Sequence, residues 1–183
     1  VDNPKTLGYL FVIVGILNAI GGVLGAVSSL TAEALGIGYA VSAVGGLIAG
    51  IIVIVFGVNI LKGALTSKND IFAGMIKVLG ITNIISGVFM IIASFMGAGD
   101  ILSGIIGIVV GIIIFLVGQK IDNGFGKVLW FILVLIFVIA VIGDIVLVIG
   151  SFAVLSGLVS AIASLLIDVI GLVYLFDDSI REA

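Results

Sequence analysis

The chain repeats one stretch, Gly15-Ile16-Leu17-Asn18-Ala19-Ile20-Gly21-Gly22-Val23, as Gly80-Ile81-Thr82-Asn83-Ile84-Ile85-Ser86-Gly87-Val88. The shared positions are spaced i, i+3 and i+7, which places them on one face of a helix. They are Gly15/Gly80, Asn18/Asn83 and Gly22/Gly87. A second segment, residues 50–57, is echoed by residues 111–118. The repeating unit is therefore a pair of apolar helices of about 60 residues.

The composition is that of an integral membrane protein. Of the 183 residues, 63% are hydrophobic and only 9% are charged, and the mean hydropathy is +1.58. These are too few polar side chains to cover a water-soluble globule. The chain has no His and no Cys, which excludes catalysis and metal or haem ligation by those side chains. We expect a lipid bilayer as the surroundings, no cofactor and no metal. No nucleic acid partner is expected either, since the basic residues are scattered singly.

Six apolar runs predict an all-α transmembrane bundle, a single domain over residues 1–183. The runs pair into three tandem helical hairpins, at residues 7–61, 71–118 and 128–176. Each run of about 20 residues gives roughly 30 Å of helix, enough to cross a bilayer. Each hairpin holds two spans, so the internal repeat is parallel. The first run also imitates a signal peptide, but its length and its repeated Asn18 face favour a span.

Basic residues gather at one face of the predicted bundle. The basic residues at this face are Lys5, Lys62, Lys68, Lys120, Lys127 and Arg181, and Lys77 is close enough to reach it. Only Glu33 and Asp100 lie in the opposite loops. Because Lys and Arg in short loops mark the cytoplasmic side, both termini are expected to be cytoplasmic, with the chain in the cell or cytoplasmic membrane.

Regularly spaced glycines predict close contacts between helices. Small residues let helix backbones approach each other in lipid, where burial of apolar area gives no driving force. The glycines assigned to packing are Gly15, Gly22, Gly50, Gly57, Gly80, Gly87, Gly111 and Gly118. This surface is larger than one small bundle needs, so we expect a homo-oligomer or partner subunits. On this view Gly50→Leu or Gly111→Leu weakens the association.

Polar residues inside the spans predict an intramembrane site. Asp144 aligns with Asn18 and Asn83 of the other two hairpins, and a polar stripe runs along the last span. The stripe consists of Ser156, Ser160, Ser164 and Asp168. Ionisable groups in lipid are costly and often mark a proton or ion path, and the two asparagines either join helices or coordinate an ion or solute. The carboxylates could instead be wetted structural residues. No His or Lys lies beside them, so no enzymatic activity is expected.

One hairpin turn carries a family resemblance. The returning helix begins Gly99-Asp100-Ile101-Leu102-Ser103 after a glycine-rich turn. With the three-hairpin layout and the repeated opening of the first and third spans, this start resembles the HdeD-like acid-resistance membrane proteins. The prolines that these proteins often carry in the hairpin turns are missing here. The resemblance implies a non-enzymatic membrane protein of the stress or envelope kind, with no catalytic residues to carry over.

Two functions stay open from the sequence. The first is a non-enzymatic polytopic membrane protein, either an envelope or stress component or an accessory subunit packed into a larger membrane complex by its glycine faces. The second is a proton- or ion-coupled channel or transporter that uses Asp144 and Asp168. Many secondary transporters have inverted rather than parallel repeats, which favours the first function without removing the second.

Overall fold

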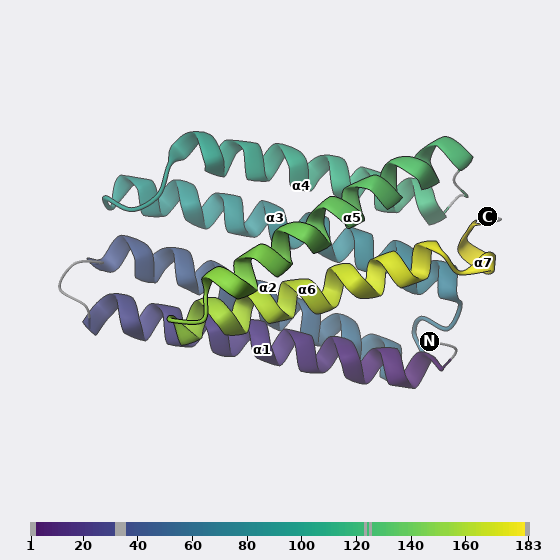
Figure 1. Cartoon of the computed structure of the whole chain (residues 1–183), viewed down its shortest axis with the longest axis horizontal. Helices are drawn as coiled ribbons and strands as arrows, with labels where there is room; N and C mark the ends of the chain where they lie inside the picture. Colours follow the sequence, from purple (N-terminus) through teal and green to yellow (C-terminus); the bar gives the residue numbers. More distant parts are fainter. Residues whose placement is uncertain (1–2, 32–35, 123, 125, 182–183) are drawn as a thin grey trace.

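The computed structural model of the chain describes residues 3–31, 36–122, 124 and 126–181, arranged as a bundle of long helices (Figure 1). Within these residues there is no strand. The helices are α1 (Pro4–Thr31), α2 (Gly36–Leu61), α3 (Lys68–Phe95), α4 (Ile101–Asp122), α5 (Lys127–Gly150), α6 (Leu155–Leu175) and the short α7 (Asp178–Arg181). The first six are long and apolar enough to cross a membrane. The predicted all-α, six-span membrane fold is confirmed.

The helices extend beyond the apolar runs that predicted them. α1 begins at Pro4 rather than at residue 7, α3 begins at Lys68 rather than at residue 71, and α4 continues to Asp122. Ser67 caps α3 by accepting a hydrogen bond from the backbone N–H of Asp70, at 3.1 Å. Hydropathy detects the lipid-crossing segment only, whereas caps and polar residues set where a helix begins and ends.

The turn between α3 and α4 follows from its glycines and one acidic cap. Gly97 and Gly99 have φ values of 83° and 85°, a conformation that side-chain-bearing residues rarely adopt. Asp100 then accepts hydrogen bonds from the backbone N–H groups of Leu102 and Ser103, at 3.2 and 3.1 Å. The motif that suggests a family is thus a capped start of α4.

Glycines hold the first two hairpins together. All eight glycines assigned to packing lie at contacts inside α1–α2 or α3–α4: Gly22 faces the backbone of Leu47, and Gly87 faces that of Gly104. The surface that was expected to bind another subunit is therefore covered by the chain's own helices. These eight glycines therefore give no evidence for an oligomer, and the oligomer itself stays a prediction.

The third hairpin packs differently. Gly143 and Gly150 of α5 have no neighbour within 4 Å of an added Cβ, and Gly171 of α6 meets the ring of Phe137 instead of a backbone. In the alignment that matches Asn83 with Asp144, α5 carries Val141 and Val148 where α3 carries glycines. Because these side chains are larger, α5 and α6 are held together through side chains rather than through close backbones.

The helices follow one another around a central space. α2 also packs on α3 and α6 packs on α1, so neighbours run in the order α4, α3, α2, α1, α6, α5. α5 crosses in front of the other hairpins diagonally and packs mainly on α6 (Figure 1). No extended contact joins α4 to α5 among the described residues. The ring of helices is therefore open between α4 and α5.

Both termini lie at one end of the bundle, and the apolar core is concentrated there (Figure 1). The large side chains buried at this end include Leu7, Phe11, Ile60, Ile71, Phe72, Ile121, Tyr174 and Leu175. Lys68 Nζ donates to Asp177 Oδ2 at 2.7 Å, and Lys77 pairs with Asp122. Asp100 lies at the opposite end, while Glu33 lies outside the described residues. The cytoplasmic location of the termini stays a prediction.

Candidate intramembrane polar site

A cavity of about 660 Å³ lies between the six long helices. Each helix contributes to its lining, so the cavity occupies the space inside the ring described above. The cavity falls in the range of about 300–1,000 Å³ that is usual for small-molecule sites.

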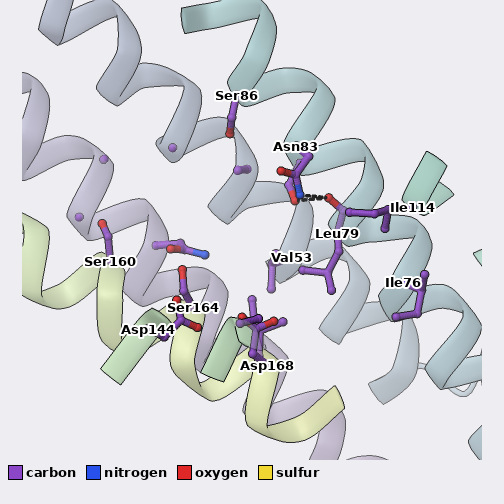
Figure 2. Close-up of a pocket in the computed structure, with 18 of the residues that line it drawn as sticks. Val53, Ile76, Leu79, Asn83, Ser86, Ile114, Asp144, Ser160, Ser164 and Asp168 are labelled. Atoms are coloured by element: carbon purple, nitrogen blue, oxygen red, sulfur yellow. Dashed lines mark hydrogen bonds between the residues drawn. The ribbon is translucent and has the colours of Figure 1, made fainter. Parts of the chain in front are cut away.

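The structure brings together every polar residue that the sequence assigned to an intramembrane site. All seven line this cavity: Asn18, Asn83, Asp144, Ser156, Ser160, Ser164 and Asp168. Figure 2 shows Ser160, Ser164, Asp144 and Asp168 gathered on one side, with Asn83 and Ser86 from α3 opposite. The aligned positions of the three hairpins thus face the same space, although the third hairpin packs differently from the others.

Two further polar residues of the lining were missed from the sequence, Thr82 and Ser86. Both lie inside the repeated stretch, and Ser86 is one helical turn beyond Asn83. That spacing puts Ser86 on the face of Asn83 and was the available signal. The first copy of the repeat has Gly21 at the position of Ser86, so the comparison of the two copies gave no sign of a polar residue there.

Asp144 is buried in a helix that is otherwise exposed to its surroundings. Only Leu133, Phe137 and Asp144 are buried along α5, and their spacing places them on one helix face. Asp144 is 8% exposed, and its Oδ2 is buried without a hydrogen-bond partner in the part of the chain that the structure describes. A buried, unpaired oxygen costs free energy, so Asp144 is not placed here for the stability of the fold.

Asp168 lies within interacting distance of Asp144 across the contact between α5 and α6. The two are the only ionisable side chains among the described residues that line the cavity. Two carboxylates facing each other in a low-dielectric site repel strongly unless a proton or another cation lies between them. Such a pair can hold a proton or another cation.

The α3 side of the cavity presents oxygen atoms. Asn83 Nδ2 donates to the Leu79 carbonyl at 2.9 Å, and Thr82 Oγ1 donates to the same carbonyl at 3.0 Å. These hydrogen bonds turn a donor of each side chain toward its own helix and leave the oxygen atoms as acceptors. Oxygen acceptors from α3, opposite the carboxylates of α5 and α6, suit a cation better than an anion.

The described lining of the cavity offers one pair of carboxylates. No group of three or more His, Cys, Asp or Glu side chains that could hold a metal ion comes together in the described residues. Hard divalent ions are usually held by more oxygen ligands than one carboxylate pair supplies. The arrangement fits a proton or a singly charged cation.

No family model, curated protein or solved structure matches the chain. The functional assignment consequently rests on the geometry of the cavity. The resemblance to the HdeD-like family stays a prediction.

Proposed function

We propose that this polytopic membrane protein binds a cation, protons included, at Asp144 and Asp168 and passes it across the membrane. The observation that carries the proposal is the facing carboxylate pair in a cavity that all six long helices line. The proposal takes the second of the two functions that the sequence left open and assigns the protein no chemical reaction.

Asp144 and Asp168 both lie within membrane-spanning helices. A charged side chain within the bilayer costs about 2.5–3.5 kcal/mol on insertion scales, and such residues usually face a bundle interior that carries ions or protons. Asp144 comes from a helix that could present an apolar residue at this position, as it does at Leu133 and Phe137. The presence of Asp144 inside the bundle, beside Asp168, is best explained by a cation that neutralises both carboxylates.

The polar stripe gives such an ion a route. Ser156, Ser160 and Ser164 follow one another along α6 at one-turn intervals and end at Asp168. All four line the cavity, so their hydroxyl and carboxyl oxygens form successive stations between the end of α6 near residue 155 and the carboxylate pair.

The other function, an accessory subunit packed into a larger complex, is supported less well by this geometry. It depended on glycine faces free to bind a partner, and these faces are occupied inside the two hairpins. A homo-oligomer or partner subunits stay a prediction with no surface assigned to them.

The test is flux through the purified protein in liposomes. With an imposed pH or K⁺ gradient, wild-type liposomes should carry protons, Na⁺ or K⁺ faster than empty liposomes, and Asp168→Asn should abolish the difference. Asp100→Asn is the matched control, because Asp100 lies outside the cavity and Asn also caps helices. No flux above that of empty liposomes, with an Asp168→Asn protein as stable as wild type, would overturn the proposal in favour of a structural role.

A further inference from the structure

The cavity is much larger than a proton or an inorganic ion requires. Its volume of about 660 Å³ far exceeds the roughly 30 Å³ of liquid that one water molecule occupies. A site built for a bare ion would close its ligands around that ion. The space beside Asp144 and Asp168 therefore accommodates a ligand of many atoms, of which the charged group is only a part.

The lining is divided into an apolar half and a polar half. Toward the end that holds the termini, the walls consist of Val53, Ile76, Leu79, Ile114, Val117, Leu133, Phe137 and Ile167. Toward the other end they consist mainly of polar or small residues, among them Asn18, Gly22, Gly25, Gly46, Asn83, Ser86, Ser156 and Ser160. Asp168 follows Ile167 on α6, so the polar stripe of α6 ends with a carboxylate that lies beside the apolar half. A ligand matched to this division has a charged group and an apolar body.

The charge of the lining determines whether the charged group of the ligand is positive or negative. The two carboxylates are the only charged side chains among the described residues of the lining, and Lys and Arg are absent from them. Asp144 is nine-tenths buried, lines the cavity and has an oxygen without a partner. A positive group would pair with it, whereas a neutral ligand would require a proton to neutralise the carboxylate pair and an anion would be repelled.

One side of the cavity faces the bilayer. Ile113 of α4 and Ile136 of α5 both line the cavity, yet they are 55% and 52% exposed. They lie on the two helices that make no extended contact with each other in the described residues (Figure 1). A molecule dissolved in the lipid can therefore reach the cavity between α4 and α5 without crossing the polar half.

From the divided cavity and the buried Asp144, whose Oδ2 has no partner among the described residues, we infer that the ligand is a hydrophobic organic cation, such as a substituted amine or phosphonium, that enters from the lipid between α4 and α5. Its positive group lies at Asp144 and Asp168, and its apolar body lies among the residues of the apolar half. This inference rests on the proposed function and names the class of cation that the site takes.

The experiment uses tetraphenylphosphonium and its near-isosteric anion tetraphenylborate. Binding of each to the full chain, purified in a non-ionic detergent, is measured by equilibrium dialysis. We expect saturable binding of the phosphonium and none of the borate. Asp168→Asn and Asp144→Asn should each weaken phosphonium binding at least about tenfold, because each removes one partner of a buried charge pair, while Asp100→Asn should leave it unchanged.

A third variant tests the cavity itself. Ala140→Trp places a large side chain on the lining of α5 and retains both carboxylates. It should abolish phosphonium binding. Thermal unfolding and gel filtration of every variant show whether it is folded, and the borate comparison on the wild-type protein decides the question even where a variant fails to fold.

The outcomes separate this inference from the proposed function. Flux of protons or inorganic cations without phosphonium binding overturns the inference and leaves the proposed function standing. Phosphonium binding that Asp168→Asn removes, in a protein without measurable flux, supports the ligand class and overturns transport. Equal binding of phosphonium and borate shows partition into an apolar surface and overturns the inference.

Discussion

Gly15 and Gly50 meet back to back: a Cβ added to either one would lie 2.7 Å from the carbonyl oxygen of the other. Gly80 and Gly111 stand in the same relation, also at 2.7 Å in both directions. Real Cβ atoms essentially never come this close to a backbone atom. The two hairpins therefore use the same reciprocal contact, and each is closed by backbones that only glycine allows to approach.

We expect Gly50→Ala and Gly111→Ala to destabilise the protein by about 1–3 kcal/mol each, because the added methyl group forces two backbones apart. Gly46→Ala and Gly107→Ala are the controls, since their nearest atoms lie at 3.9 and 3.5 Å. The measurement is the midpoint of thermal or denaturant unfolding in detergent. A Gly50→Ala protein as stable as Gly46→Ala would show that this contact is not needed.

Asp144 leads to a second prediction on stability. Its buried Oδ2 has no hydrogen-bond partner in the described structure, and such a group costs roughly 1–3 kcal/mol. Asp144→Leu should therefore raise the unfolding midpoint, while abolishing the cation flux proposed for the site. Asp178→Leu, at an exposed position outside the cavity, measures the effect of the same substitution elsewhere. A large loss of stability in Asp144→Leu would mean that the carboxylate supports the fold.

The spans and the register of the polar site were predictable because both depend on local periodicity. A bilayer demands an apolar segment of a certain length, and helical spacing determines that Asn18 and Gly22 share a face whatever the tertiary arrangement. The alignment of Asp144 with Asn18 and Asn83 extended this register to the third hairpin. These positions all line the cavity.

The partners of those faces were not predictable from periodicity. Which glycine meets which depends on how the helices are paired, so the sequence placed Gly50 on a packing face but did not show that its partner is α1. The contact of Phe137 with Gly171, which holds α5 on α6 through a side chain, joins positions that no repeat relates. Asp144 and Asp168 likewise come together only through the packing of α5 on α6. The short α7 was likewise not predicted: Asp177, just before it, accepts hydrogen bonds from Ser179 and pairs with Lys68 of α3.

The topology can be tested directly because the chain has no cysteine of its own. A single cysteine at Asp100 should react with a membrane-impermeant maleimide added to intact cells. A single cysteine at Lys127, at the end of the bundle that holds both termini, should react only after the cells are opened. Labelling of both from the same side would exclude the six-span arrangement, and the reverse pattern would place the termini outside.

The ion pair between Lys68 and Asp177 gives a prediction on pH. Lys68 joins the start of α3 to the segment after α6, and its hydrogen bond, with further bonds from Ser179, lowers the pKa of Asp177 from 3.8 to about 2. A carboxyl group whose pKa is lower in the folded protein stabilises the fold above its unfolded pKa and loses this effect as the pH falls through its folded pKa. The pair should therefore contribute fully above about pH 4 and lose its contribution as the pH falls toward about 2.

We expect Asp177→Asn to reduce the unfolding free energy by roughly 0.5–1 kcal/mol at pH 7, as for a partly exposed ion pair. The difference from wild type should shrink between about pH 4 and pH 2. Asp178→Asn, at the neighbouring exposed carboxylate, is the matched control for the substitution itself. A constant difference between Asp177→Asn and wild type across this interval would mean that Asp177 acts through packing or backbone hydrogen bonds rather than through its charge.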